Sequence, residues 1–382
     1  MPYAETYTLT VQRTFAKNYT AEIGYIGTRG IHLPTQIQLN VQAPVTAANQ
    51  LPTLLSGSTT VTAPAGANTL GKLETLSNIV PAFNANGFTS KITSYQPYSQ
   101  SNYNALIANV TRRFIDGLQA NLSYTWSKTM DDATAEVFST TLTPRRPQNS
   151  QNVNADYSRS ALDRTHRISL EAVYDFQYKR SNSFLMKNLV GNWTIAPIYT
   201  YESPEYATVL SNVNSNLNGD STAIDRPIIN PNGKKGTATT VVPQFASNLA
   251  NLCQPSDNGQ CANNTVGYIA VDPNAYYIQA GAGTLPTASR NTLPTRPINN
   301  IDMSAYKRLT FHEHYSFEFG AQAYNVLNHA QYTPGTVGNI NQTSNTTSVI
   351  NFQKVDNAFF GQPGKVFQNN ARTMQLSGKF FF

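Results

Sequence analysis

The sequence has few charged residues and only two cysteines, and it contains no long apolar run. Charged residues make up 13% of the 382 positions, about half the share in an ordinary globular domain. The net charge of +6 is spread thinly along the chain, so no nucleic-acid partner is expected. No run of about 18 apolar residues is present, which excludes a membrane-spanning helix. Aromatic residues make up 11% of the chain, which excludes a highly charged disordered segment.

Sequence motifs for catalysis and cofactor binding are also missing. The sequence contains neither a glycine-rich phosphate loop nor a nucleophile elbow, so we assign no catalytic, cofactor-binding or metal-binding residue and expect no enzyme. Cys253 and Cys261 lie in a segment rich in Asn, Pro and Gly. They form either a small disulfide of an oxidising compartment or two free thiols. His312 and His314 flank Glu313, and a solvated turn is favoured there over a metal site.

One polar segment has the spacing of a calcium-binding loop. The oxygen-bearing residues and the glycine of the pattern are Asn214, Asn216, Asn218, Gly219, Asp220 and Asp225. The first position is Asn rather than Asp, and the last acid is Asp rather than the longer Glu that such loops use. A hydrogen-bonded Asn-Gly turn in an external loop is therefore the favoured interpretation.

Alternation of apolar and polar residues is the main positive signal. In residues 118–127, Leu, Ala, Tyr and Trp occupy the even positions and polar residues occupy the odd ones. Alternate residues of a strand point to opposite faces, so this segment has one apolar and one polar face. The same pattern occurs in 3–13, 19–28, 166–177, 191–201, 315–325 and 373–382, and less clearly in 101–114 and 299–310. We predict about nine strands of roughly 10–14 residues, longer than soluble strands and suited to a tilted bilayer crossing.

The connections between these segments alternate between short and long. Short turns are predicted at 16–18, 115–117, 179–189 and 311–314, and long polar loops at 29–100, 129–163, 204–298 and 329–364. Short turns on one side and long loops on the other are typical of outer-membrane barrels, whose short side is periplasmic. We expect the long loops to be mobile Asn-, Thr- and Gly-rich tracts that carry the substrate contacts.

Aromatic and charged residues fit the same architecture. Aromatic residues gather near both ends of the strands, as at two membrane interfaces. On the short-turn side they are Phe15, Tyr19, Phe114, Phe176, Tyr178, Trp193, Phe311, Tyr315, Phe380 and Phe382; on the other side they are Tyr3, Tyr25, Tyr124, Trp126, Tyr199 and Tyr201. The strand charges fall on the polar face, which would line a water-filled lumen: Glu22, Arg167, Glu171, Asp175, Asp302 and Glu318.

Strand direction gives a further expectation. With nine strands, the first and the last both run toward the short-turn side, whereas bacterial single-chain barrels have an even strand number. The chain is therefore expected to be the C-terminal portion of a larger barrel; in a barrel of about 22 strands it would supply the last nine. The N-terminus has no charged n-region and no apolar h-region, so either the protein is not exported or this chain lacks its natural beginning.

The strand segments resemble the C-terminal barrel of Oar-like TonB-dependent receptors of Gram-negative bacteria. The matching pieces are Pro2-Tyr3 through Arg13, Glu22 through Gly30, Ser101 through Leu106, Leu122 through Lys128 with Asp131-Asp132, Asp163 through Arg167, Gly191-Asn192-Trp193, Asp302-Met303-Ser304 and Ala323 through His329. They cover nearly all strands and little of the long loops. Each piece alone is weak, and the combination is specific.

The resemblance implies an all-β, antiparallel transmembrane barrel in the outer membrane, with residues 1–382 as one barrel region that lacks the plug and the N-terminal strands. It further implies that Met1 is an internal methionine or the start of a truncated gene. It implies outer-membrane lipid, a plug domain and the TonB protein as partners, and uptake of an oligosaccharide, peptide or chelate by the intact protein. Phe382, with Phe380 before it, resembles the signal read by the barrel-assembly machinery, although Gly378 is one position from its usual place. A complete small barrel acting as an adhesin or passive pore, and a secreted β-rich binding protein or enzyme, are the alternatives.

Overall fold

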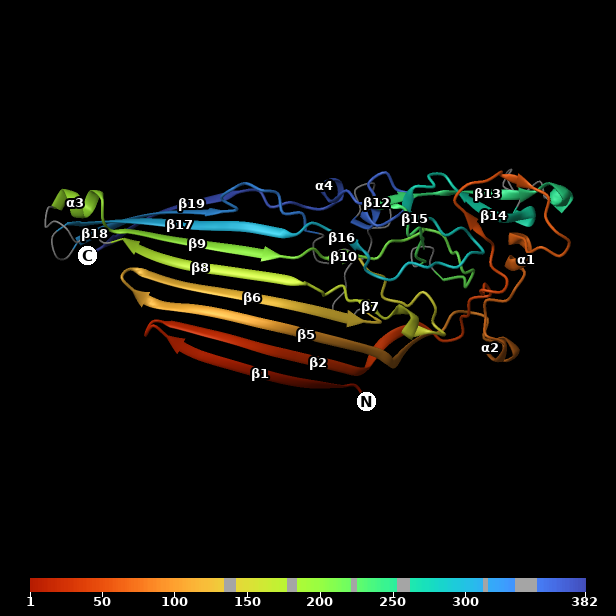
Figure 1. Cartoon of the computed structure of the whole chain (residues 1–382), viewed down its shortest axis with the longest axis horizontal. Helices are drawn as coiled ribbons and strands as arrows, with labels where there is room; N and C mark the ends of the chain where they lie inside the picture. The colour runs from red at the N-terminus through yellow and green to blue at the C-terminus, as the bar shows by residue number, and fades with distance from the viewer. Residues whose placement is uncertain (134–141, 177–183, 221–224, 253–261, 312–314, 334–348) are drawn as a thin grey trace.

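The long strands form one antiparallel sheet at one end of the molecule, and the loops gather at the other end (Figure 1). The computed structural model describes all residues except 134–141, 177–183, 221–224, 253–261, 312–314 and 334–348. In order across the sheet, the strands are β1 (Tyr3–Phe15), β2 (Tyr19–Gln38), β5 (Thr93–Ile115), β6 (Leu118–Asp131), β8 (His166–Phe176), β9 (Trp193–Glu202), β17 (Ile298–Phe311), β18 (Tyr315–Tyr324) and β19 (Thr373–Phe381). The short β7 (Ser158–Arg159) pairs with the end of β6.

These nine strands are the nine segments that alternation predicted, in the same order. Three of them run into segments that were expected to be loop: β2 reaches Gln38 and β5 begins at Thr93, inside 29–100, and β6 reaches Asp131, inside 129–163. Irregular pairing follows Gly30 and Leu33, and His32 has a φ of 57°. Bulges of this kind shift the side-chain alternation, so the period-two pattern fades although the strands continue.

The predicted tight turns are present where the structure describes them. Asp116 and Gly117, between β5 and β6, have φ values of 51° and 79°, and positive φ at both central residues is the conformation of a tight hairpin turn. The turn at 311–314 lies mainly outside the described residues. The segment 179–189 is more than a turn, because its described part forms the helix α3 (Phe184–Leu189).

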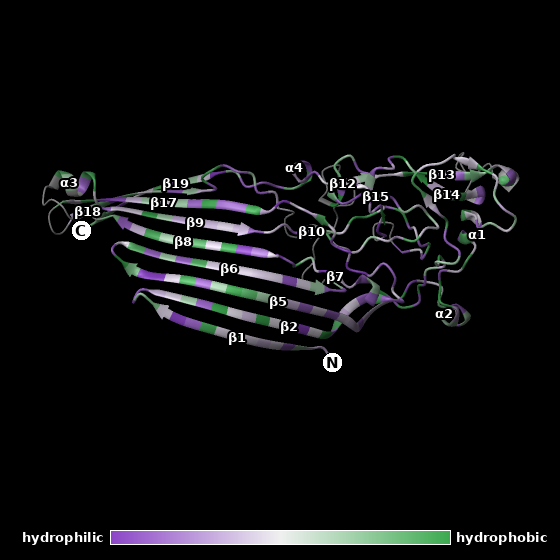
Figure 2. Ribbon diagram, viewed as in Figure 1, coloured by the Kyte–Doolittle hydropathy of each residue, from purple (hydrophilic) through white to green (hydrophobic). Residues whose placement is uncertain are grey.

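The sheet has an apolar face and a polar face across its whole width. Leu9 pairs with Tyr25, Tyr25 with Leu106, and Leu106 with Trp126, so the apolar sets of neighbouring strands share one face. Bands of alternating hydropathy follow each strand in Figure 2. Leu9 is 70% exposed and Leu376 is 78% exposed. This face is therefore not the core of a compact sheet in water, since soluble proteins rarely expose such a large apolar patch.

The sheet is open, with β1 at one edge and β19 at the other. Both strands run from the loop end to the turn end, and the two termini accordingly lie at opposite ends of the sheet (Figure 1). A direct β1–β19 pairing would therefore be parallel, unlike every other pairing of these nine strands. Among the described residues, no helix is both long enough and apolar enough to cross a membrane.

The described parts of residues 39–92, 132–165, 203–297 and 325–372 gather at the loop end, and we call them the loop cap. Its short strands are β3 (Thr53–Leu54), β4 (Thr60–Val61), β10 (Tyr206–Ala207), β11 (Ile228–Ile229), β12 (Lys234–Thr239), β13 (Val241–Ala246), β14 (Thr265–Ala270), β15 (Ala275–Ile278) and β16 (Leu293–Pro294). They pair as three small sheets. Its helices are α1 (Leu70–Glu74), α2 (Pro81–Ala85) and α4 (Pro363–Val366), with 3-10 turns at Val153–Asp156, Ser247–Leu252, Ala262–Asn264 and Val349–Phe352.

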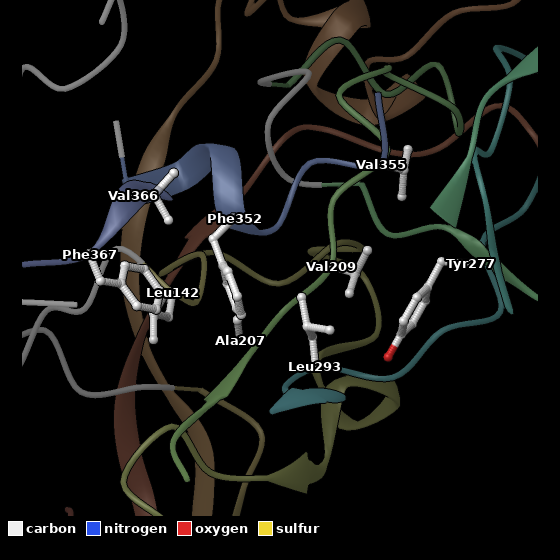
Figure 3. Packing of buried hydrophobic residues seen from close by; sticks show 9 residues of the cluster. All are labelled: Leu142, Ala207, Val209, Tyr277, Leu293, Phe352, Val355, Val366 and Phe367. Atoms are coloured by element: carbon white, nitrogen blue, oxygen red, sulfur yellow. The ribbon is translucent and has the colours of Figure 1, made fainter. Parts of the chain in front are cut away.

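The loop cap has its own hydrophobic interior, which the sequence did not predict. One buried cluster joins distant segments of the chain (Figure 3): Leu142, Ala207, Val209, Tyr277, Leu293, Phe352, Val355, Val366 and Phe367. A second contains Leu51, Leu70, Leu73 and Tyr268. Burying each large apolar side chain contributes about 1.5–3 kcal/mol. The described part of the cap is therefore packed around its own interior rather than being a set of separate polar tracts.

Candidate functional site

The polar face of the sheet is a continuous surface of hydrogen-bonded side chains. At its centre, the Asn109 side chain donates to Glu22 over 3.3 Å and accepts from the Ser123 hydroxyl over 2.7 Å. Beside it, the Thr111 hydroxyl donates to Asn121 over 2.9 Å. Because β2, β5 and β6 present these groups in register, the face is both hydrophilic and ordered. Such a surface suits contact with water or with a polar solute.

Charges on the polar face are paired near both ends of the strands. The six charged residues predicted to lie on this face all occupy its register positions. Near the turn end, Arg308 contacts Glu318 over 2.7 Å. Near the cap, Arg167 contacts Glu202 over 3.0 Å. These exposed pairs contribute little to stability, and they keep charge on the polar side of the sheet.

Three carboxylates at the junction of β5 and β6 with the cap hold the segments together. Asp131 forms a buried ion pair with Arg290 over 3.2 Å and accepts from the Ser160 hydroxyl. The next residue, Asp132, accepts from the Gln100 amide over 2.9 Å. Asp163 accepts from the Thr129 amide over 2.7 Å. The structure thus brings together two sequence pieces that carried the family resemblance, Asp131-Asp132 and Asp163-Arg164.

Two other pieces of the resemblance also meet in space. Asp302 on β17 accepts from the Asn325 amide over 2.7 Å. The Asn325 side chain then donates to the carbonyls of His329 and Asn370, each over 2.9 Å. With a φ of 53°, Asn325 turns the chain out of β18, because Asn tolerates the left-handed conformation better than most residues. The shared pieces therefore fix the points where strands become loops.

A second buried ion pair lies within the cap. Arg226 contacts Asp156 over 2.7 Å, and its side chain also donates to the Ala288 carbonyl over 2.8 Å. The two charged side chains are 9% and 3% exposed. A buried charge is tolerated only when it is paired and hydrogen-bonded. This pair therefore ties three loops of the cap to one another, and sequence inspection missed it.

The loop with calcium-like spacing is organised by a buried carboxylate that accepts from protein donors. Asp225 accepts from the Ser215 amide over 2.6 Å, from the Ser215 hydroxyl over 2.9 Å and from the Asn216 amide over 3.2 Å. Burial raises the pKa of Asp225 to about 6. Burial, reinforced by the neighbouring Asp225, raises the pKa of Asp220 to about 7. Residues 221–224 of the loop lie outside the described residues, and the choice of a hydrogen-bonded turn over a calcium loop stays a prediction.

The other candidate chemical sites lie in undescribed segments. Cys253 and Cys261 fall within 253–261, and the pair of histidines around Glu313 falls within 312–314. In the rest of the chain, no group of three or more His, Cys, Asp or Glu residues is arranged to hold a metal ion.

The cap contains a cavity of about 410 Å³ lined by uncharged residues, at the place where β2 and β5 continue beyond the other strands into the cap. Its lining combines the Tyr98 ring and apolar side chains with uncharged polar residues next to the 3-10 turn: Ile37, Leu39, Ser150, Gln151, Asn152, Val153 and Asn154. An aromatic ring beside several amides can bind a neutral, hydroxyl- or amide-bearing ligand.

Comparisons with known proteins found several outer-membrane structures and one family model that are similar to this chain. The structure matches those of the Escherichia coli outer membrane transporter YddB (TM-score 0.41, 11% identity), the Acinetobacter baumannii ferric preacinetobactin receptor BauA (0.40, 8%) and P. aeruginosa FpvA bound to pyoverdine (0.39, 8%). The matches cover 99–100% of this chain and 33%, 29% and 27% of those chains, so the chain spans a third or less of their length. A search of curated proteins found no match. A family model described as "Outer membrane beta barrel domain" matches residues 1–375.

Proposed function

The chain belongs to the family of outer membrane beta barrel domains, and from that membership we propose that residues 1–382 are one barrel region of an Oar-like TonB-dependent receptor. The supporting observation is the sheet itself. It has nine strands with a lipid-compatible apolar face, a hydrogen-bonded polar face and a structured cap at one end. The pieces that resemble Oar-like receptors lie on the strands and at the strand–loop junctions, where they form the contacts of Asp163 and Asn325.

In this proposal the chain supplies the C-terminal part of a larger barrel. The edges β1 and β19 run in the same direction, so antiparallel closure needs an odd number of additional strands. The intact receptor would enclose a plug and draw energy from TonB, and it would import a nutrient rather than catalyse a reaction. The strand β19, with Phe382 directly after it, would be the contact for the barrel-assembly machinery.

Closure provides the test of this proposal. Residues 1–382 and a longer chain that includes the sequence encoded upstream would be folded in phospholipid vesicles and compared by heat-dependent migration on gels. We expect only the longer chain to form a compact, detergent-resistant barrel, and uptake by producing cells to stop when TonB is deleted. A compact form of residues 1–382 alone, with discrete conductance, would favour the complete small barrel acting as an adhesin or passive pore.

The cap favours a neutral substrate for this receptor. The cavity beside Tyr98 is lined by uncharged residues, which suits an oligosaccharide or a peptide better than an anionic chelate. We expect Tyr98→Ala to weaken binding of such a ligand in calorimetry, while Tyr3→Ala, on the apolar face, leaves binding unchanged. Equal affinities of the two variants would remove the cavity from the binding site.

A further inference from the structure

The described side chains of the short helix α3, at residues 185, 186, 188 and 189, have the reverse of the distribution expected for a helix in water. Leu185 and Leu189, one helical turn apart, are 71% and 73% exposed. Met186 and Val190 lie beside them and are also exposed. Among the described side chains of α3, the buried one is polar: Asn188 is only 7% exposed. A surface helix in water normally turns its apolar side toward the protein.

Polar contacts hold α3 against the end of the sheet. The Asn188 side chain accepts from the Thr310 amide over 2.8 Å and donates to the Thr310 carbonyl over 3.1 Å, as a neighbouring strand residue would. At the C-terminal end of the helix, Lys307 donates to the carbonyls of Leu189, over 3.2 Å, and Gly191. The bond to Leu189 satisfies a carbonyl of the last turn of the helix. The apolar side of α3 is thus held pointing away from the sheet.

The helix lies at the turn end of the sheet and is continuous with its apolar face. In Figure 1, α3 lies beyond the ends of β9 and β17, far from the cap. Lys307 pairs in register with Trp193 on the apolar face, and its ammonium lies 4.9 Å from the centre of the Trp193 ring. Trp and Lys side chains of this kind gather at membrane interfaces. The exposed leucines of α3 therefore extend the aromatic band that ends the apolar face.

We propose that α3 is an interfacial anchor that inserts Leu185 and Leu189 into the headgroup–acyl boundary of the phospholipid leaflet on the turn side. Moving apolar side chains from water into that boundary is favourable, and short amphipathic segments bind membrane surfaces in this way. The occupant is lipid rather than a periplasmic protein, because the helix continues a surface that faces lipid and is docked through a residue of that surface, Lys307.

Depth-dependent quenching tests the proposal. In a Cys253→Ser, Cys261→Ser background, single cysteines at Leu185, Leu122 and Leu55 would carry an environment-sensitive fluorophore, in vesicles of phosphatidylethanolamine and phosphatidylglycerol. Leu122 reports the apolar face of β6, and the exposed Leu55 reports the cap. We expect lipids with a nitroxide near the headgroup to quench position 185 several-fold more than position 55, and deep nitroxides to quench position 122 most.

Quenching at 185 no stronger than at 55, with 122 quenched, would overturn the proposal and show that a protein or water covers α3. An unquenched position 122 would overturn it as well, because the apolar face itself would then lie outside lipid. A second variant, Asn188→Ala, separates docking from insertion: loss of the two bonds to Thr310 should broaden the range of depths that quench position 185. An unchanged depth profile in this variant would show that the sheet does not set the position of the helix.

Discussion

A charge placed on either side of β6 at the same depth should have opposite consequences. Leu122 and Ser123 are adjacent, and they point to the apolar and the polar face, respectively. Leu122 lies four residues from Leu118, at the turn, and four from Trp126. At about 3.3 Å per residue and a tilt near 40°, each separation is about 10 Å along the membrane normal, so Leu122 lies near the centre of an apolar band about 25 Å tall.

Leu122→Arg should therefore cost about 2–4 kcal/mol of folding free energy, a change of about 30- to 900-fold in the folding equilibrium. Ser123→Arg loses the 2.7 Å bond to Asn109 and should cost about 1 kcal/mol. Guanidinium titrations in vesicles, followed by tryptophan fluorescence, would measure both variants of the protein that carries this sheet. If Ser123→Arg is as destabilising as Leu122→Arg, the assignment of the two faces to lipid and water is wrong.

Three further predictions concern the cap and the turns. Arg290→Met leaves the buried Asp131 without its ion-pair partner, and the loss of about 3–5 kcal/mol should appear as faster hydrogen exchange in the cap; unchanged exchange would contradict it. The pKa of Asp220 is raised to about 7 in the folded cap, whereas its unfolded value is about 3.9. The folded cap therefore binds more protons than the unfolded one, and its resistance to proteolysis should fall as pH rises between these two values. Asp220→Asn should make this pH dependence flatter, and an equally steep profile in the variant would refute the assignment. Gly117→Ala should lower the thermal midpoint more than Gly236→Ala. Both glycines have φ near 80°, but only at Gly117 would the added carbon lie 2.3 Å from a backbone oxygen. Equal losses of the thermal midpoint would mean that φ strain alone matters.

The nine strands could be predicted because each has two different surroundings. A strand with an apolar environment on one side and a polar one on the other needs side chains that alternate. In β6 apolar and polar residues alternate at nearly every position. The signal was lost in the upper part of β2, where bulges interrupt the alternation while the pairing with β5 continues.

The cap could not be predicted in the same way. Its apolar residues come singly from distant segments, as Leu142, Val209 and Phe352 do, so no periodic pattern marks them. The same holds for its ion pairs. Arg226 and Asp156 are 70 residues apart, and nothing in either local sequence indicates the other. The polar spacing around Asp225 was visible, but whether that carboxylate meets donors or a cation depends on the three-dimensional path of the loop.

Among the described residues, every member of the two hydrophobic clusters belongs to the cap, and none belongs to the nine long strands of the sheet. The protein is thus stabilised in two separate ways: the bilayer around the apolar face stabilises the nine strands, and the buried interior of the cap stabilises the loops. Substitutions on the outer surface of the loops can accumulate without lowering the stability of the nine-stranded sheet. The exposed loop residues can therefore change while the apolar face of the nine strands stays the same.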